Sequence, residues 1–295
     1  MNATPPPLGL LLDVDGPIAS PVTRTIALPQ ITADLVALAA AGVPLVFNTG
    51  RSDAFIRSEV VAPLLAAGLP AGARVHGVCE KGAVWFSIGP EHGADGTGPI
   101  EVDESLAMPD DFAREMDELV RDEFADLVFF DRTKRAMVSI EQLTSVPSAT
   151  YLARQASFDE NAAQALTRRG SGVRRLDDVR PDADGAVQWR IDPTIISTDI
   201  ESVRLGKDLG ADRALELLAA DGALPTRWRT VGDSRSDYAM ADRLYALGHE
   251  VAHVDVRPAD GVPTTPYPVL TASDPAITND EAGAEFLAGW VRELL

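Results

Sequence analysis

The 295-residue sequence contains a single cysteine, Cys79, so no disulfide can form within the chain. Independence from disulfides suits a reducing compartment, and we expect a cytoplasmic location. No apolar stretch approaches the ~20 residues that span a bilayer, so we expect no membrane partner. The opening residues MNATPPPLG have neither the basic nor the apolar region of a secretory signal, which supports the same expectation.

Basic residues are scarce relative to acidic ones. The chain has 26 Lys and Arg against 45 Asp and Glu, a formal net charge of −19. This charge repels phosphate backbones, and the basic stretches at 132–135 and 168–169 are short and isolated, so we expect no nucleic-acid partner. If the ligand of such an acidic protein is an anion, the site must screen charge locally, which indicates a bound cation.

Two stretches of the chain, 1–88 and 193–295, alternate between apolar runs and helical patterns. In the first stretch the expected strands are 8–14, 44–48 and 74–79, and the expected helices between them are 30–41 and 53–67. The same alternation returns after residue 203. Alternating strands and helices are typical of a parallel, doubly wound α/β sheet. We therefore predict one Rossmann-like core domain formed by 1–88 and 193–295.

Residues 89–192 have a different pattern. They begin with a Gly- and acid-rich loop, GPEHGADGTGP, and a strand pattern (IEVDE) and a helical pattern (110–124) follow. Two further strand patterns, LVFF and RAMVSIEQL, then meet across DRTK as in a hairpin. We predict that 89–192 is an α+β domain inserted into the core domain.

The first apolar run ends on two acids. In LGLLLDVDGPIAS (8–20), Asp13 and Asp15 stand one residue apart. Side chains alternate along an extended segment, so both carboxylates can face one ion, and Gly16 lets the backbone turn sharply beside it. The structural alternative is a solvated turn after a strand.

A second acidic pair follows the run RWRTVG. In GDSRSD (232–237), Asp233 ends the expected strand and Asp237 comes four residues later. If a helix begins near Ser234, Asp233 is its N-cap residue and Asp237 lies one turn further on the same face. Helix capping alone would also explain Asp233.

Ligands of doubly wound sheets bind at the carboxyl ends of the strands, where NTGRS (48–52) also lies. Thr49 supplies a hydroxyl, and the loop supplies backbone N–H groups at a helix N-terminus, which suits an anion. Lys207 stands near the start of the helix expected at about 206–220, and it precedes the strand that ends on Asp233. Most single lysines on helices are solvated, so only the other motifs single out Lys207.

The order of these motifs resembles that of the haloacid dehalogenase-like hydrolases. Their four signatures match DVDG, NTGR, Lys207 and GDSRSD in order. An insert between the second and third signatures is similar to the branch with a large α/β cap, which includes Cof-type phosphatases and the sucrose- and trehalose-phosphate phosphatases. The stretch CEKGAVWF also resembles the ENGA segment of that branch, with Lys81 in place of the usual Asn.

The resemblance implies a metal-dependent mechanism on paired acids. Asp13 would be the nucleophile that forms an aspartyl-phosphate, and Asp15 the general acid and base. Mg²⁺ would be held by Asp13, Asp233 and the backbone carbonyl of Asp15, with Asp237 binding it directly or orienting its waters. The ion's charge explains why so many carboxylates lie together.

The resemblance also implies the residues that contact the phosphoryl group. These are Thr49, Gly50, Arg51 and Lys207, of which Thr49 and Lys207 also count as catalytic. Lys207 lies farther ahead of Ala214 than the family pattern has it, so Arg213 or Arg204 remains an alternative for the third motif.

The expected function is that of a Mg²⁺-dependent phosphatase acting on a small phosphorylated metabolite, most simply a sugar phosphate. Two alternatives stay open at this point. A phosphosugar mutase of the same fold would return the phosphoryl group to the sugar, and a non-catalytic protein of this fold would bind or regulate without turnover.

Overall fold

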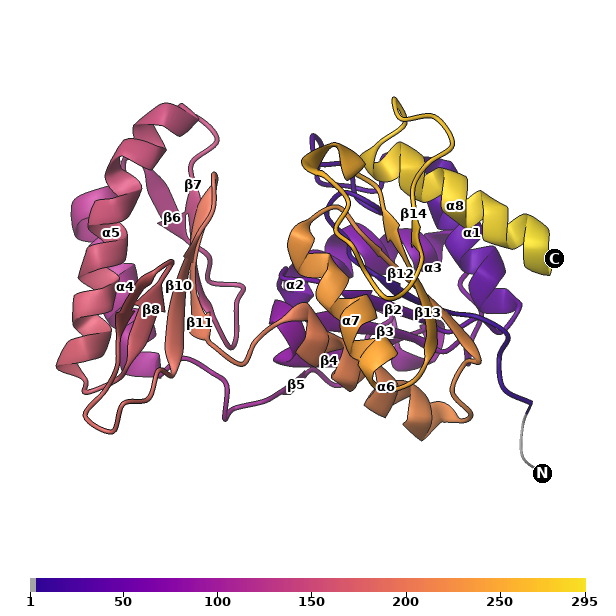
Figure 1. The fold of residues 1–295 in the computed structure, drawn as a ribbon, viewed down its shortest axis with the longest axis horizontal. Helices are drawn as coiled ribbons and strands as arrows, with labels where there is room; N and C mark the ends of the chain where they lie inside the picture. Colours follow the sequence, from indigo (N-terminus) through magenta and orange to yellow (C-terminus); the bar gives the residue numbers. More distant parts are fainter. Residues whose placement is uncertain (1–3) are drawn as a thin grey trace. The chain divides into compact units, whose positions relative to one another are not determined.

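A computed structural model describes residues 4–295; residues 1–3, part of the opening segment discussed above, lie outside the described residues. The chain divides into two compact units (Figure 1). The first runs to Glu101 and resumes at Gly206, and the second is Val102–Leu205. No helix within 4–295 is long and apolar enough to cross a membrane.

The first unit is built around an eight-stranded sheet with the order β14-β13-β12-β1-β2-β3-β4-β5. Neighbours from β14 to β3 run parallel, and β4 is antiparallel to β3. The strands are β1 (Gly9–Leu12), β2 (Leu45–Asn48), β3 (Val75–Cys79), β4 (Val84–Ile88), β5 (Glu101–Val102), β12 (Arg227–Gly232), β13 (Glu250–Asp255) and β14 (Val269–Leu270). Every residue of β1 and β2 is buried, which fits parallel strands covered on both faces.

Helices cover both faces of this sheet (Figure 1). On one face, α1 (Pro29–Ala40) packs against α8 (Asn279–Leu294), and on the other α6 (Lys207–Asp221) packs against α7 (Tyr238–Ala246). Apolar side chains of α6 and α7 share one buried cluster with the sheet residues Leu11, Val46 and Trp228. The helix expected at 53–67 consists of α2 (Asp53–Ile56), a π-helical turn (Arg57–Val61) and α3 (Ala62–Ala66). The doubly wound α/β core that the alternation predicted is therefore confirmed.

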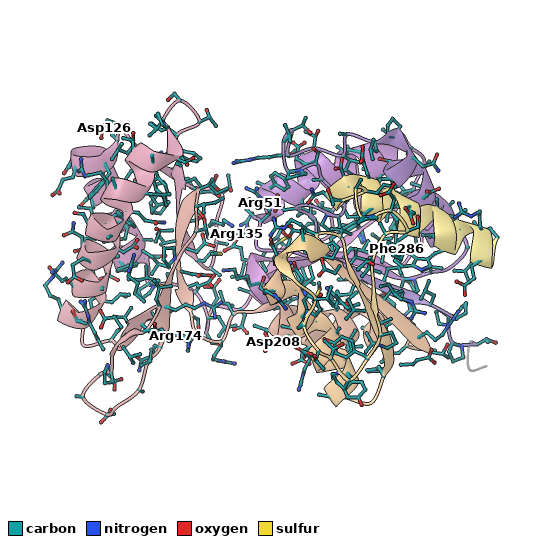
Figure 2. All side chains as sticks on the ribbon, turned by 45° about the horizontal axis from the view of Figure 1, so that its top comes forward. Arg51, Asp126, Arg135, Arg174, Asp208 and Phe286 are labelled. Atoms are coloured by element: carbon teal, nitrogen blue, oxygen red, sulfur yellow. The ribbon has the colours of Figure 1, made fainter. Side chains whose placement is uncertain are left out.

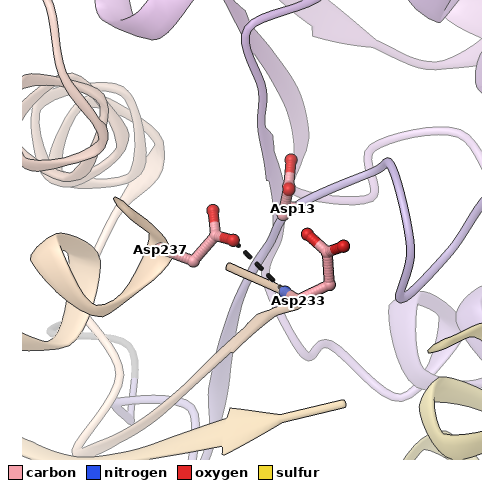
Figure 3. A group of neighbouring side chains, drawn as sticks. All are labelled: Asp13, Asp233 and Asp237. Carbon is pink, nitrogen blue, oxygen red and sulfur yellow. Dashed lines mark hydrogen bonds between the residues drawn. The ribbon is translucent and has the colours of Figure 1, made fainter. Parts of the chain in front are cut away.

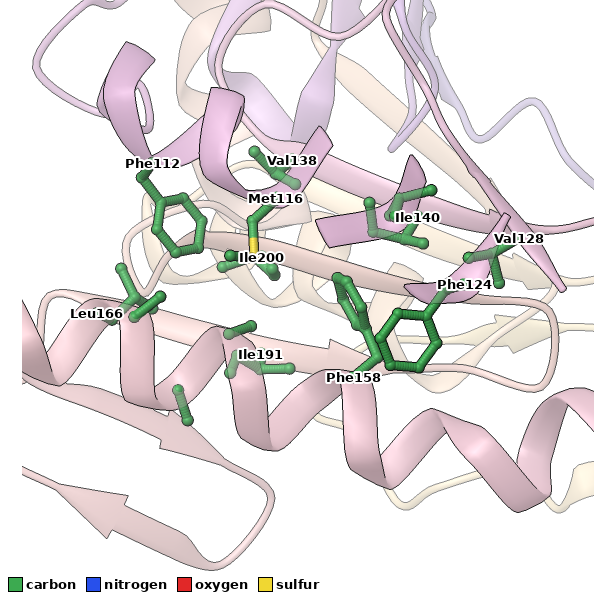
Figure 4. Close-up of a cluster of buried hydrophobic side chains, with 14 of the residues drawn as sticks. Phe112, Met116, Phe124, Val128, Val138, Ile140, Phe158, Leu166, Ile191 and Ile200 are labelled. Atoms are coloured by element: carbon green, nitrogen blue, oxygen red, sulfur yellow. The ribbon is translucent and has the colours of Figure 1, made fainter. Parts of the chain in front are cut away.

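The second unit has a six-stranded sheet with the order β6-β7-β11-β10-β8-β9 and two long helices. Its elements are α4 (Asp110–Leu119), β6 (Val128–Phe130), β7 (Val138–Gln142), α5 (Ser148–Arg168), β8 (Val173–Arg175), β9 (Asp178–Arg180), β10 (Trp189–Pro193) and β11 (Ser197–Ser202). All strand pairs are antiparallel except β10 with β8. Buried side chains such as Phe112, Phe158 and Ile191 join the helices to one face of the sheet (Figure 4), so the unit has the predicted α+β class.

The unit boundaries lie later in the chain than the predicted 88/89 and 192/193. β5, which the sequence analysis placed in the inserted domain, lies next to β4 in the sheet of the first unit. β11, which it did not predict, pairs with both β10 and β7 and keeps the chain in the second unit up to Leu205. Its sequence, STDIES, contains one apolar residue and therefore gives no strand pattern.

Candidate functional site

Three carboxylates meet at the carboxyl edge of the first unit's sheet. Asp13 follows β1, Asp233 follows β12, and these two strands are hydrogen-bonded neighbours. Asp237 follows in a short helical turn after β12. Figure 3 shows the three side chains beside one another, and one oxygen of each lies within 4.8 Å of one oxygen of the others. Parallel neighbours end at the same edge, which is why residues far apart in sequence are brought together.

The helix after β12 is capped by Ser234, which corrects the expectation that Asp233 is the N-cap residue. The Ser234 hydroxyl donates to Asp237 Oδ2 at 2.7 Å, and the backbone N–H groups of Asp233 and Ser234 donate to the same oxygen at 3.2 and 3.0 Å. Because Ser234 and Asp237 form the capping box, the side chain of Asp233 is not used by the cap. Its carboxylate is left for the site.

Lys207 lies at the centre of the acidic cluster. Its ammonium Nζ is 2.7 Å from Asp13 Oδ1 and 2.7 Å from Asp237 Oδ1, and the lysine is only 8% exposed. Asp13 Oδ1 also accepts the backbone N–H of Val14 at 2.7 Å, so its orientation is doubly held. The lysine for which the sequence carried the weakest signal is therefore the one that joins two of the acids.

Asn48, at the end of β2, holds Lys207 in place. Lys207 Nζ donates to the Asn48 carbonyl at 2.9 Å, and the Asn48 side-chain N–H donates to the Lys207 carbonyl at 2.9 Å. The fully buried amide lies against Gly210, where a Cβ would come within 2.0 Å of Asn48 Oδ1. A glycine is thus required at 210 for the start of α6 to approach β2 this closely. The sequence analysis quoted Asn48 within NTGRS but assigned it no role.

The two alternatives for the third motif lie elsewhere. The Arg213 guanidinium stacks 3.8 Å from the ring centre of Trp85 and pairs with Glu216 at 2.7 Å. Arg204 belongs to the second unit, where its N–H donates to Ser202. Of the three basic residues considered, Lys207 is the one that contacts the acidic cluster.

Burial and mutual charge set the ionisation of the cluster. Burial, with the charge of Asp237, raises the pKa of Asp13 well above its ordinary value despite the opposing Lys207. Burial alone would raise the pKa of Asp237 too, but Lys207 and the hydrogen bonds from Ser234 hold it below its ordinary value. Burial, followed by the charge of Asp237, raises the pKa of Asp233 to about 6. Lys207 thus favours the ionised form of Asp237, and further positive charge would favour the ionised forms of Asp13 and Asp233.

A divalent cation fits this shortage of positive charge. Asp13, Asp233 and Asp237 present hard carboxylate oxygens within reach of a single ion, which is the ligand type that Mg²⁺ prefers. The turn after β1 passes close by, since a Cβ on Gly16 would lie 2.8 Å from Asp233 Cγ. Gly16 also has a φ of +93°, so a glycine is favoured there on both grounds.

Asp15 faces Arg51 rather than the three-carboxylate group. The Arg51 guanidinium donates to both oxygens of Asp15, from Nε at 2.8 Å and from Nη2 at 2.9 Å. Arg51 follows β2 and is labelled in Figure 2; it also stacks 4.7 Å from the ring centre of Phe55. A bidentate pair of this kind fixes both side chains and brings a guanidinium to the edge of the site.

Thr49 and Gly50 form the bend between β2 and Arg51. Thr49 is fully buried, and its hydroxyl oxygen accepts the backbone N–H of Arg51 at 3.1 Å. The Thr49 carbonyl accepts the N–H of Lys81, and the Lys81 side chain passes 3.6 Å from the position of a Cβ on Gly50. Lys81, the departure from the ENGA pattern, has a left-handed φ of +56° and contributes both backbone and side chain to this bend.

Arg257 belongs to the site and was missed by the sequence analysis. It follows β13, the strand beside β12, and its guanidinium Nη1 lies 3.3 Å from Asp233 Oδ2. Its backbone N–H donates to Asp255 at 2.9 Å, and Nη2 pairs with Asp260 at 2.9 Å. The sequence does offer one indication of Arg257: it follows an expected strand of the parallel sheet, as Asp13, Thr49 and Asp233 do.

Comparisons with known proteins address the fold. No protein-family model and no curated protein matches the sequence. Among solved structures, the C-terminal domain of trehalose-6-phosphate phosphatase from C. albicans is 12% identical, with a TM-score of 0.65 over 99% of this chain and 93% of that chain. Trehalose-6-phosphate phosphatase from Aspergillus fumigatus is 14% identical, with a TM-score of 0.52 over 97% and 92%.

A haloacid dehalogenase-like hydrolase from Bacteroides thetaiotaomicron is similar to the same extent. It is 13% identical, with a TM-score of 0.59 over 96% of this chain and 98% of that chain. At such identities the likeness concerns the fold alone. The chain has the fold of the haloacid dehalogenase-like hydrolases, including the inserted unit, which confirms the fold that the order of its motifs predicted.

Proposed function

We propose that the protein is a Mg²⁺-dependent phosphatase that hydrolyses a small phosphorylated metabolite through an aspartyl-phosphate on Asp13. One observation carries the proposal: a buried carboxylate, Asp13, is held by Lys207 in contact range of two further acids, Asp233 and Asp237. A solvated turn needs neither a buried lysine nor three converging carboxylates. Phosphoryl transfer needs both a positioned nucleophile and positive charge around it.

The first step joins Asp13 to the phosphoryl group. An Asp13 carboxylate oxygen attacks phosphorus, the bond between phosphorus and the ester oxygen breaks, and Asp15 donates a proton to the departing oxygen. Lys207 and the Val14 N–H hold Asp13 Oδ1, and so they orient the carboxylate before attack. The substrate's phosphoryl oxygens would draw the Arg51 guanidinium away from Asp15, which frees that carboxyl for proton transfer.

The second step restores the enzyme. Asp15 accepts a proton from a water molecule, the water oxygen bonds to phosphorus, and the bond from phosphorus to Asp13 breaks to release inorganic phosphate. Thr49, Gly50, Arg51 and Lys207 surround the phosphoryl oxygens in this proposal. Their hydroxyl, backbone N–H and cationic groups offer the donors that an anionic group of this size requires.

Mg²⁺ would be held by Asp13, Asp233 and Asp237, with the backbone carbonyl of Asp15 as a further oxygen ligand. When bound, the ion supplies positive charge that offsets the repulsion between the acids and an anionic substrate. The raised pKa values of Asp13 and of Asp233, the latter to about 6, support a cation there, because its charge would stabilise the carboxylate forms that the proposed roles need.

A sugar phosphate is the proposed substrate class, and a cytoplasmic location is proposed with it. Two of the structures that share the fold are named as trehalose-6-phosphate phosphatases, and they match the chain over both units. The formal net charge of −19 argues for a small substrate rather than a nucleic acid.

Phosphate release from a panel of sugar phosphates tests the proposal, with and without Mg²⁺. We expect Asp13→Asn to lower kcat at least about a thousandfold, since an amide of the same shape is a poor nucleophile. Asp280→Asn, which removes a carboxylate from α8, is the matched control and should leave kcat unchanged. Full activity in excess EDTA, or a retained rate in Asp13→Asn, would contradict the mechanism. An isomeric sugar phosphate in place of free phosphate would identify a mutase.

A further inference from the structure

Three cations of the chain lie against the four acids of the site. Four carboxylates and three cations lie in these contacts: Asp13, Asp15, Asp233 and Asp237 with Lys207, Arg51 and Arg257. With every group ionised the set carries a net charge of −1 before any metal binds. These cations therefore offset most of the negative charge that would attract a divalent ion to the four acids.

Arg257 is the cation that contacts a metal-binding acid from outside the cluster. Lys207 is almost fully buried, whereas the Arg257 side chain is 43% exposed and the Asp233 side chain 18%. The guanidinium reaches Asp233 Oδ2 with Nη1 and the exposed Asp260 with Nη2. Arg257 Nε, although buried, has no hydrogen-bond partner within residues 4–295. Arg257 therefore contacts Asp233 through one long ion pair, which it can give up for Asp260 or solvent.

We propose that Arg257 competes with the metal ion for Asp233 and so sets the metal affinity of the site. The inference rests on the metal site of the proposed function and adds a residue to it. A guanidinium on one oxygen of Asp233 neutralises part of the charge with which that carboxylate attracts a divalent ion. Metal binding must therefore displace Arg257 towards Asp260 or solvent, at a cost in affinity.

Removing the Arg257 charge should strengthen metal binding. With Arg257→Gln the cluster carries −2 instead of −1, and Asp233 loses its competing partner. We expect the dissociation constant for Mg²⁺ alone, measured by calorimetry without substrate on metal-stripped protein, to fall about tenfold. Arg257→Lys keeps the charge and should stay within about threefold of the unaltered protein.

Two further variants test whether the effect passes through Asp233. Arg235→Gln removes a charge from the turn after β12, where Arg235 bonds the Asp260 carbonyl and not Asp233, and it should change the affinity less than twofold. In an Asp233→Asn background, Arg257→Gln should no longer strengthen binding. Should Arg257→Gln lower the unfolding temperature of the metal-free protein, Arg257→Met carries the same expectation.

The outcomes separate this inference from the proposed function. If the unaltered protein binds Mg²⁺ and Arg257→Gln binds it equally or more weakly, Arg257 does not compete for Asp233 and the inference is wrong. If the gain persists without the Asp233 carboxylate, the effect is general charge and the inference is again wrong. If neither protein binds Mg²⁺ at all, the metal site itself is wrong, and the proposed function fails with it.

Discussion

Replacing Lys207 by methionine should expose how much the acidic cluster depends on one buried ammonium. The methionine side chain is one atom shorter and fills most of the same space, but it leaves Asp13 and Asp237 without a counter-charge, although they are 7% and 0% exposed. Removing one partner of a buried ion pair costs about 3–5 kcal/mol, because the remaining charge stays out of water. With two carboxylates left, we expect a loss at the upper end of this range at pH 8.

The loss of folding stability in Lys207→Met should be smaller at acidic pH, because protonation of Asp13 and Asp237 removes the uncompensated charges. In the unaltered protein Lys207 holds the pKa of Asp237 low, whereas without it burial raises the pKa of both acids above the unfolded value of ~3.9. The folded variant then binds more protons than the unfolded chain, so its stability falls as pH rises from about 4. We expect the difference from the unaltered protein to be about 2 kcal/mol smaller at pH 5 than at pH 8.

Urea unfolding followed by tryptophan fluorescence measures the free energy of unfolding of both proteins at pH 5 and pH 8. A Trp189→Phe background removes the one tryptophan of the second unit, so the signal then comes from the first unit alone. The double variant Lys207→Met with Asp237→Asn should recover more than half of the lost stability, because one buried charge has gone. A loss below about 1 kcal/mol at pH 8, or an equal loss at both pH values, would refute the reasoning.

Two further predictions concern the surroundings of the cluster. Burial lowers the pKa of His253 to about 4, so below pH ~6.5 the folded state binds fewer protons than the unfolded chain and the stability of the fold decreases as the pH falls. We expect His253→Asn to remove about 2 kcal/mol of the stability loss between pH 7 and pH 5. An unchanged pH dependence of stability in urea unfolding would contradict this prediction. Gly16→Ala should cost about 1–3 kcal/mol and weaken Mg²⁺ binding, since the new Cβ would meet Asp233 at 2.7 Å. Gly68→Ala is its control: Gly68 has a similar φ of +88°, and no atom of residues 4–295 lies within 4 Å of its Cβ position, so this substitution should leave Mg²⁺ binding unchanged.

The sequence by itself determined which residues end the central strands of the first unit. Asp13 follows the apolar run GLLL, Thr49 follows LVFN, and Asp233 follows RWRTVG, whose last three residues are buried. Short runs of this kind are typical of parallel strands that are covered on both faces. Since parallel neighbours end at one edge, the alternation of strands and helices was enough to predict that these residues share a site. The fold class follows from the same local pattern.

Only the tertiary structure decided which cations complete the site. Lys207 begins a helix and Arg257 follows a strand, and neither residue's neighbours in sequence distinguish it from a solvated basic residue. Their contacts with Asp13 and Asp233 arise from the packing of α6 against β2 and from the pairing of β13 with β12. Asn48 and Gly210, which allow that packing, are 162 positions apart and meet only in the fold.

Strand pairing in the tertiary structure also decided where the second unit ends. β11 contains one apolar residue among six, so no periodicity reveals it, yet hydrogen bonds from β7 and β10 on its two sides make it a central strand. Backbone groups of a strand can form the same inter-strand hydrogen bonds whatever side chains the strand carries. The pattern of apolar residues within the strand therefore does not show which strands it pairs with. Local sequence therefore places side chains on strand ends and helix starts, and long-range pairing decides which of them meet.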